Sequence, residues 1–432
     1  MIIVFVLGYA AIALEHPIKV DKAASALIIG GLGWALFAFS GVDHHTLTHE
    51  IQHHIVDIAE ILFFLLGAMT IVELVDAHQG FAIITDKITT NKKVYLIWIL
   101  SVITFFFSAV LDNLTTAIVM AALLPKLIKD KETLWLFAGV LIMAANAGGA
   151  WSPIGDVTTI MLWIGGQVSA ANIITAVIIP STVCARVPLI YLSFKLKGDV
   201  ERPLDNELDE HKKNPTSPFE RNLVFYLGVC GLLFVPVFKT VTHLPPYVGM
   251  LLSLGVLWLV TEIIHRSKNH EVKSQLSVIG VLRKVDTPTI FFFLGILLAV
   301  SALQSAGQLD IVATWLATTF GGQSIKGVYI INIIIGLLSS IVDNVPLVAG
   351  AMQMYQDLLS TEGLYQPDGM FWQFLAYCAG TGGSALIIGS AAGVAVMGLE
   401  RIDFVWYLKN ISLLAILGYF AGAGVYLLMF AL

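Results

Sequence analysis

The sequence predicts an all-α polytopic membrane protein with two inverted repeats, each containing a re-entrant helical hairpin and a broken transmembrane helix. Of the 432 residues, 57% are hydrophobic and only 12% are charged, whereas soluble domains carry roughly twice that share of charge. Long apolar runs such as "SALIIGGLGWALFAF" recur along the whole chain. Apolar helices of about 20 residues can cross a bilayer because they satisfy their own backbone hydrogen bonds.

The apolar segments follow one another closely. They run over 1–14, 23–40, 56–75, 94–124, 133–164, 168–194, 222–238, 245–264, 288–304, 327–359, 370–399 and 403–431. The first segment has no basic residues ahead of it, so we interpret it as a membrane helix and not as a cleaved signal. Segments 94–124 and 327–359 are too long for one crossing, and an Asp-Asn pair interrupts each. Both are therefore expected to return to their own side as re-entrant hairpins.

Basic residues then predict the orientation. If both long segments are re-entrant, one side of the membrane holds Lys19, Lys22, the loops 87–93, 126–131, 195–221 and 266–284, Arg401 and Lys409. Lys239 and Lys326 fall on the other side, and Arg186 lies inside a helix. Positive charge marks the cytoplasmic side. We therefore expect the first hairpin to open to the cytoplasm, the second to the outside, and both termini to lie outside.

An internal repeat supports this topology. "LFFLLGAMTIVELVDAHQG", "SAVLDNLTTAIVMA" and "ANAGGAWSPIGD" are answered, in the same order, by "FFFLGILLAVSALQSAGQ", "SSIVDNVPLVAGAM" and "GTGGSALIIGSAAG". The two copies enter the membrane from opposite sides, so the repeats are predicted to be inverted. Inverted repeats with broken helices are typical of secondary transporters, whose binding site lies at mid-membrane between the halves.

The Asp-Asn pairs are the first candidate site residues. A carboxylate at mid-membrane costs roughly 2.5–3.5 kcal/mol on insertion scales, so Asp112-Asn113 and Asp343-Asn344 at matching points indicate a function. With the hydroxyl of Thr115 they offer hard oxygen ligands, which suit a small hard cation. The alternative is that each pair caps the second arm of its hairpin, which is compatible with ion binding.

The glycine-rich stretches are the second candidate. The segment 133–164 is interrupted by Asn146, Gly148, Gly149, Ser152, Pro153, Gly155 and Asp156, and the matching stretch holds Gly382, Gly383, Ser384 and Gly389. An unwound stretch exposes carbonyls to a cation. Asp156 is a third carboxylate, with Ser390 in the matching place, and would favour proton exchange. Close helix packing at the glycines is the alternative.

Three charged residues outside these motifs are possible accessories. Arg186 could pair with a carboxylate such as Asp156, or its side chain could extend to the cytoplasmic face. Glu73 and Asp76 lie near the cytoplasmic end of 56–75 and could line a proton path, although their position at the membrane interface would also explain them.

The stretch "THEIQHH" raises a different class of function. His49, Glu50 and His53 form H-E-x-x-H, the spacing by which a helix binds catalytic zinc. The stretch is polar, and we expect a short loop outside the membrane with no room for a protease domain. An adventitious metal site, a pH-responsive surface or a plain solvated loop are the alternatives, and no zinc site or enzyme is expected. Cys184, Cys230 and Cys378 give no disulfide framework, and nothing indicates nucleic-acid binding.

The motifs "ILFFLLGAMTIVELVDAHQGF", "SAVLDNLTTAIVM", "ANAGGAWSPIGD" and "SSIVDNVPLVAGAM" resemble those of bacterial sodium/proton antiporters of the NhaD type, in the ion transporter superfamily. The resemblance covers nearly the whole chain. It implies Na⁺ export, often also of Li⁺, against H⁺ in the bacterial cytoplasmic membrane, with activity favoured by alkaline pH. It also implies a homodimer whose transport part moves as an elevator, no cofactor, and Na⁺ held at Asp112, Asp156 and Asp343.

The resemblance divides the chain into parts. Scaffold helices are expected at 1–90 and 222–325, transport parts at 91–200 and 326–432, and a cytoplasmic linker at 201–221. Anion carriers of the same fold, for arsenite or di- and tricarboxylates, are the alternative. They resemble one another in a Ser-Asn-Thr hairpin tip, and the acids at these tips favour a bare cation.

Overall fold

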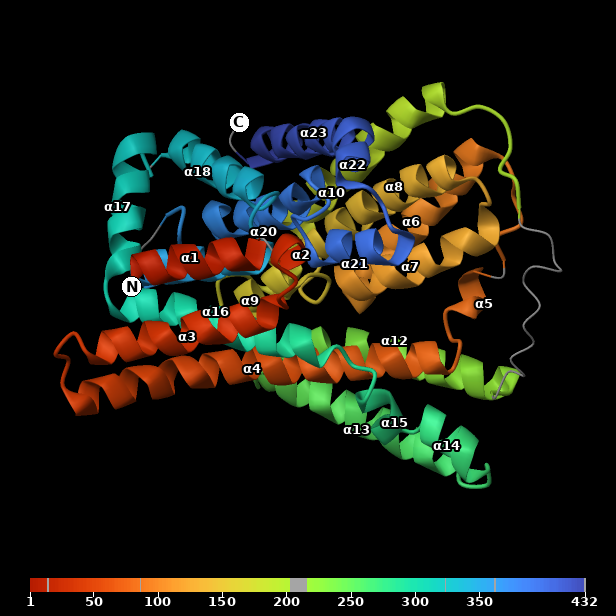
Figure 1. Ribbon diagram of the computed structural model, residues 1–432, viewed down its shortest axis with the longest axis horizontal. Coiled ribbons are helices and arrows are strands. Elements are labelled where there is room, and N and C mark those ends of the chain that lie inside the picture. Colours follow the sequence, from red (N-terminus) through yellow and green to blue (C-terminus); the bar gives the residue numbers. More distant parts are fainter. Residues whose placement is uncertain (14, 86, 203–215, 323, 361–362, 431–432) are drawn as a thin grey trace.

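The computed structural model describes residues 1–432 apart from 14, 86, 203–215, 323, 361–362 and 431–432 (Figure 1). The described chain is nearly all helical, with one isolated β-bridge, between Lys92 and Asp199, and no strand. Eight of the described helices are long and apolar enough to cross a membrane. The prediction of an all-α polytopic membrane protein is therefore confirmed.

The first half contains one helix that is longer than expected. Its elements are α1 (Ile2–Ala13), α2 (Glu15–Ile18), α3 (Lys22–Ala38), α4 (His44–Ala77), α5 (Ala82–Thr85), α6 (Lys93–Leu111), α7 (Asn113–Leu127), α8 (Lys131–Ala150), α9 (Val157–Ile164) and α10 (Ala170–Lys195). The prediction of a loop before residue 56 is wrong, because α4 already begins at His44. The carboxylate of Asp43 accepts hydrogen bonds from the backbone N–H groups of His45 and Thr46, and neither Gly nor Pro occurs between 44 and 66. A capped start without a breaker favours one continuous helix.

The second half repeats the pattern with additions. It contains α12 (Pro218–Thr242), α13 (Pro246–Ile264), α14 (His270–Leu276), α15 (Val278–Leu282), α16 (Thr287–Ser305), α17 (Gln308–Phe320), α18 (Ile325–Leu338), α19 (Asn344–Met354), η1 (Gln356–Ser360), α20 (Met370–Gly382), η2 (Gly383–Ala385), α21 (Ala391–Glu400), α22 (Phe404–Asn410) and α23 (Ser412–Phe430). The sequence analysis missed α14, α15 and α17. Helix α17 has only 13 residues, too few to cross a membrane. Most of the expected linker lies outside the described residues.

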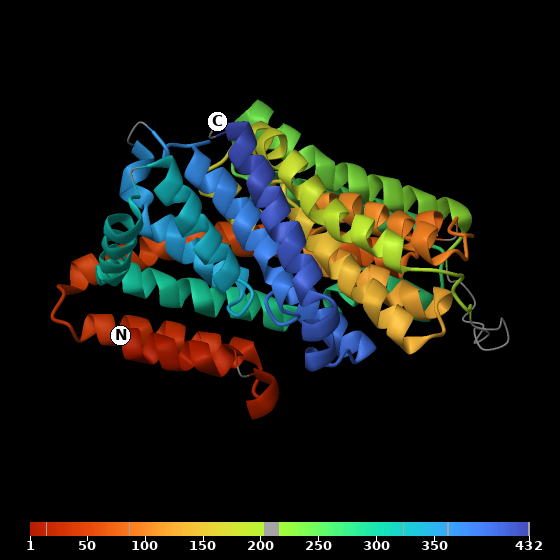
Figure 2. The same ribbon diagram turned by 90° about the horizontal axis from the view of Figure 1, so that it is seen from above.

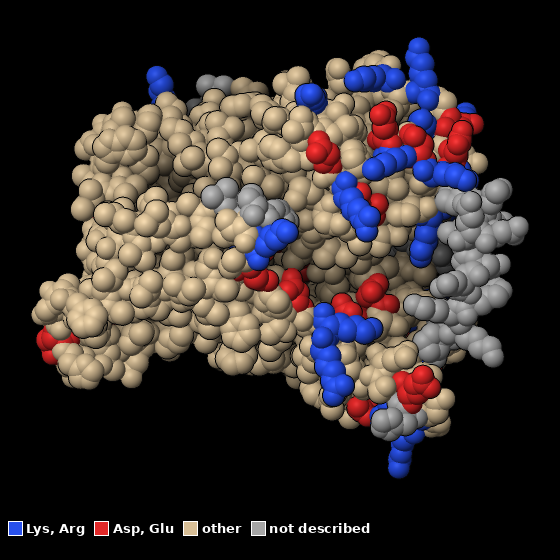
Figure 3. Space-filling model, in the orientation of Figure 1, with Lys and Arg blue, Asp and Glu red and all other residues tan. Residues whose placement is uncertain are grey.

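The two hairpins lie toward opposite ends of the molecule. The first hairpin, formed by α6 and α7, lies in the right part of Figure 1. The second hairpin is formed by α18 and α19. Its helix α18 lies in the left part beside α17, and both helices of this hairpin contact α17. Figure 2 shows the N-terminal helices, in red, at one edge of the molecule, and α4 contacts α12, α13 and α16. On the face drawn in Figure 3, Lys and Arg gather at the right end, among acidic residues. This charge asymmetry agrees with the expected placement of the basic loops. Lys22 was expected on the same side as these loops, but it lies instead beside Asp343, at the tip of the second hairpin.

Helices α3 and α16 are held together by glycines. A Cβ added at Gly295 would collide with the backbone of Ala26, and one at Gly30 with the carbonyl of Gly295. Such close approach is possible only because neither residue has a side chain. The position of α3 against α16 is therefore fixed.

Candidate ion-binding site

Asp112 forms the tip of the first hairpin. It ends α6 and caps α7, and its oxygens accept hydrogen bonds from the backbone N–H and the hydroxyl of Thr115, both at 2.8 Å. Its φ of +81° with ψ of 158° lies in a region that is essentially restricted to glycine. The capping alternative is thus correct for Asp112, and Thr115 serves that cap, while both residues also line the cavity described below.

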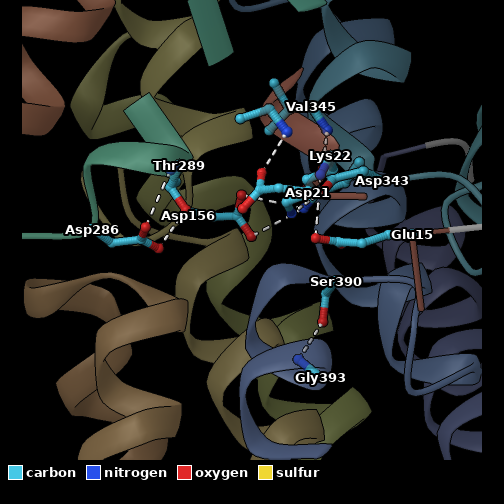
Figure 4. A network of polar contacts seen from close by, with 12 residues as sticks. Glu15, Asp21, Lys22, Asp156, Asp286, Thr289, Asp343, Val345, Ser390 and Gly393 are labelled. Carbon is cyan, nitrogen blue, oxygen red and sulfur yellow. Dashed lines mark hydrogen bonds and ion pairs between the residues drawn. The ribbon is translucent and has the colours of Figure 1, made fainter. Parts of the chain in front are cut away.

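Asp343 forms the tip of the second hairpin and caps α19. It accepts a hydrogen bond from the backbone N–H of Val345 at 3.2 Å. Its Oδ2 lies 3.6 Å from Nζ of Lys22 (Figure 4). The two Asp-Asn pairs therefore occupy matching cap positions but have different partners.

Asp156 is contacted by residues from the tips of both hairpins. It caps α9, and its Oδ1 accepts hydrogen bonds from the backbone N–H and the hydroxyl of Thr158 at 2.9 and 2.8 Å. Asn113 Nδ2 donates to its Oδ2 at 2.6 Å, and Asn344 Nδ2 lies 3.4 Å from both oxygens. Asp156 is 1% exposed. A buried carboxylate needs such donors, and here one comes from each hairpin tip.

Asn146 links the two broken helices. Its Oδ1 accepts a hydrogen bond from Asn113 at 3.1 Å, and its Nδ2 donates to the hydroxyls of Ser384 and Ser390 at 2.9 and 3.0 Å. All four residues are buried. The neutral polar groups of the predicted site thus form one network across both halves of the chain.

The three carboxylates share a cavity of about 40 Å³. Its polar lining is Asp112, Asn113, Thr115, Asp156, Thr289, Asp343 and Asn344, and Leu65, Met69 and Phe293 are among its apolar lining residues. One water occupies about 30 Å³ in the liquid. The cavity is therefore sized for a small ion with few waters.

The glycines let the breaks pack against the hairpins. A Cβ at Gly148 would collide with the carbonyl of Phe105, and one at Gly382 with the carbonyl of Gly336. Gly149 faces Gly155 and Gly383 faces Gly389 in the same way. Ser152, next to Pro153 in the break 151–156, donates its hydroxyl hydrogen to the carbonyl of Ala109. The close-packing interpretation is thus correct, and it is what brings Asp156 to the tips.

Three accessory candidates lie away from this site. Arg186 is exposed on α10, at an apolar groove with Trp98 and Phe105. The suggested pairing with Asp156 is wrong, because Asp156 is satisfied by Asn113, Asn344 and Thr158. Glu73 and Asp76 lie near the end of α4, outside the lining of the cavity.

The histidine stretch is the first part of α4 and not a loop. Glu50 accepts a hydrogen bond from the hydroxyl of Ser305 on α16 at 3.1 Å. Nε2 of the buried His54 lies 3.1 Å from the same hydroxyl oxygen, Ser305 Oγ. The described residues with metal-ligand spacing here are His53, His54 and Asp57. The side chains of the H-E-x-x-H pattern are therefore divided between solvent and α16.

Lys22, Thr158 and Thr289 are polar residues of the site that the sequence analysis missed. The pattern Asp156-Val-Thr158 is a helix-cap signal and could have identified Thr158. Lys22 was assigned only by its side of the membrane, because nothing local to it indicates a partner 321 residues away.

This architecture, with two hairpin tips meeting two helix breaks around one buried and two half-buried carboxylates, defines a membrane transporter with an ion-sized site. The family model described as "Citrate transporter" matches residues 9–374, so the chain belongs to this transporter family. Sodium/proton antiporter 1 of Arabidopsis thaliana is 46% identical over 429 residues, which are 99% of this chain and 72% of that protein. Sodium/proton antiporter 2 of the same plant is 43% identical over 432 residues, with 99% and 98% covered.

Bacterial relatives agree with this family, and a solved structure shares the fold. The Na⁺/H⁺ antiporter NhaD of Vibrio parahaemolyticus is 29% identical over 415 residues, which are 89% of this chain and 94% of that protein. The predicted resemblance to NhaD-type antiporters is confirmed. The crystal structure of the YdaH transporter of Alcanivorax borkumensis superposes with a TM-score of 0.54 at 11% identity, with 95% and 99% of the two chains covered. At this identity the likeness concerns the fold.

Proposed function

We propose that the protein is a secondary active Na⁺/H⁺ antiporter that exports Na⁺, and also Li⁺, in exchange for protons. The observation that carries the proposal is the buried carboxylate of Asp156 held between two Asp-Asn hairpin tips in an ion-sized cavity. The sodium/proton antiporter names of its relatives support the same cargo.

Charge balance explains the exchange. Moving a charge through a membrane potential is worth about 2.3 kcal/mol per 100 mV, and an unpaired charge in the hydrocarbon layer is costly. A site with three carboxylates must therefore hold either Na⁺ or protons when it crosses. We propose Asp112, Asp156 and Asp343 as the groups that alternate between the two.

An elevator motion is supported by two cavities along the same helices. Besides the site cavity, a larger cavity of about 300 Å³ is lined on α16 by Leu297, Val300 and Ser301, and on α4 by Ile58 and Ile61. Along α16, the step from the site cavity at Thr289 to Ser301 is 12 residues, or roughly 18 Å. Sliding the transport parts 91–200 and 326–432 along α4 and α16 would carry the tips from one cavity to the other.

The anion-carrier alternative fits this site less well. The family model is named for citrate, but the described residues lining the site cavity include three Asp and neither Lys nor Arg. A tricarboxylate would face three like charges in a space of about 40 Å³. The lining therefore favours a cation.

We further propose a homodimer in the bacterial cytoplasmic membrane with both termini outside. The gathering of Lys and Arg at one end of the molecule (Figure 3) and the positive-inside rule support the orientation. The bacterial NhaD relatives support the location.

The test is Na⁺-driven proton flux in everted vesicles, measured with a pH-sensitive dye. Asp112→Asn and Asp343→Asn should each abolish exchange, because Asn keeps the shape and loses the charge. Asp156→Asn should abolish exchange or sharply weaken Na⁺ affinity. Asp310→Asn, an exposed carboxylate on α17, is the matched control and should leave flux unchanged. Normal flux in correctly inserted Asp112→Asn and Asp343→Asn variants would show that the proposed site is wrong.

A further inference from the structure

Lys22, the first residue of α3, brings a cation to the edge of the ion site. Its Nζ lies 3.6 Å from Oδ2 of Asp343, and the two side chains are only 19% and 14% exposed. The same Nζ lies 4.5 Å from the centre of the Phe292 ring on α16, a cation–π distance. Among the described residues, no other Lys or Arg forms an ion pair with Asp112, Asp156 or Asp343.

The pair joins two parts of the chain that the proposed elevator would separate. Lys22 belongs to α3, which the close contact of Gly30 and Gly295 fixes against α16. Asp343 is the tip of the second hairpin, in the proposed transport part. When the transport part moves, Asp343 leaves and Lys22 stays.

The ammonium has a second acidic environment within reach. A cavity of about 200 Å³ next to the site is lined by Glu15, Asp21, Lys22 and Asp286, and also by Thr289, which lines the ion cavity too (Figure 4). Two of its carboxylates are fixed as helix caps, because Asp21 accepts from the N–H of Ala23 and Asp286 from the N–H of Thr289. When Asp343 leaves, these carboxylates are the acidic groups that line the same cavity as Lys22.

We propose that the ion cavity of this structure faces the cytoplasm, that Lys22 is the counter-cation of Asp343 there, and that Na⁺ must displace its ammonium from Asp343 in order to bind. This inference rests on the proposed antiport and adds a residue that sets Na⁺ affinity on one face. Lys22 and Na⁺ each carry one positive charge, and both cannot occupy the same partly buried carboxylate without repulsion. Na⁺ therefore binds more weakly from the cytoplasm than it would to Asp343 alone. On the outer face Lys22 no longer competes.

The experiment compares Na⁺ affinity on the two faces of the membrane. The full-length protein is placed in everted and in right-side-out vesicles, and the KM for Na⁺ is measured from dye-detected proton flux. Lys22→Gln should lower the KM by roughly threefold to tenfold in everted vesicles, the size expected for loss of a partly buried competing pair. It should leave the KM in right-side-out vesicles unchanged. Lys22→Arg, which keeps the charge, should keep the wild-type KM on both faces.

Controls separate this inference from the proposed function. Lys19→Gln removes an exposed charge three residues away and should leave both KM values unchanged. If Lys22→Gln inserts poorly, Lys22→Met keeps the aliphatic stem beside Phe292 and replaces it in the test. A raised or unchanged KM in everted vesicles, or an equal fall on both faces, overturns the role of Lys22. Absence of flux in the wild type and in Lys19→Gln would instead overturn the antiport proposal.

Discussion

At the scale of the residue, Asn146 connects the halves of the site. Its amide group has hydrogen-bond partners 33, 238 and 244 residues away in the sequence. Because its oxygen accepts from Asn113, it also orients the amide that donates to Asp156. A neutral amide is suited to this position, since it offers one acceptor and two donors without adding a charge.

We predict that Asn146→Ala impairs both stability and transport. The change removes the donor to the buried hydroxyl of Ser384, whereas Ser390 still accepts from the backbone N–H of Gly393. An unsatisfied buried group costs about 1–3 kcal/mol. The thermal unfolding midpoint in detergent should fall, and dye-detected Na⁺-driven flux should be lost. Asn410→Ala, at an exposed amide that donates only within α22, is the control and should change neither. A stable, active Asn146→Ala variant would contradict the linking role.

At the scale of the element, the breaks depend on glycine contacts between helices. Helix α20 ends at Gly382, where its backbone approaches the carbonyl of Gly336 on α18. The corresponding contact in the first half is between Gly148 on α8 and Phe105 on α6. Each hairpin is therefore seated on its broken helix at a position that tolerates no side chain.

We predict that Gly382→Ala is damaging while Gly398→Ala is not. The added methyl group at 382 must push α18 away, and such overpacking typically costs about 1–3 kcal/mol. At Gly398, inside α21, a Cβ meets no atom within 4 Å, so alanine should stabilise the helix by about 0.5–1 kcal/mol. Unfolding midpoints of the two purified variants check this. Equal effects would show that the α18–α20 contact is not tight.

At the scale of the whole molecule, a buried histidine pair ties α4 to α13 just beyond the ends of both helices. His78 and His265 stack with their ring centres 5.0 Å apart, and their Nε2 atoms lie 3.3 Å from each other. His78 Nδ1 lies 2.7 Å from the carbonyl of Leu74, to which it donates. With both rings neutral, His265 donates to His78. Lys268 and Glu220, themselves paired at 2.7 Å, lie nearby.

This pair predicts a pH dependence of stability. Burial lowers the pKa of His78, and burial together with the neighbouring His78 lowers the pKa of His265 to about 4. The unfolded chain therefore binds more protons as pH falls below about 6.5, so the contribution to stability is complete above that pH and is lost toward pH 4. Unfolding midpoints between pH 7.5 and 5 should fall more for the wild type than for His265→Gln. The exposed variant His45→Gln should follow the wild type. Equal pH slopes for the wild type and His265→Gln would contradict this assignment.

The sequence by itself determined the membrane class, most of the helices, the positions of the breaks and the family. These features depend on local signals. Apolar runs define the spans, and Gly, Pro and Asp interrupt or cap helices wherever they occur. Three of the site's carboxylates were predicted for this reason, since an Asp inside an apolar run is costly enough to indicate a role.

Only the tertiary structure decided which of these groups meet. Three contacts join segments from opposite halves of the chain. They are the convergence of Asn113 and Asn344 on Asp156, the hydrogen-bond network of Asn146, and the pairing of Lys22 with Asp343. No local sequence pattern encodes these contacts. Arg186 shows the converse, because its position in an apolar helix suggested an internal partner but the packing of α10 turns it outward. Contacts between distant segments are set by the way whole helices pack, and a single sequence contains that information only through the fold.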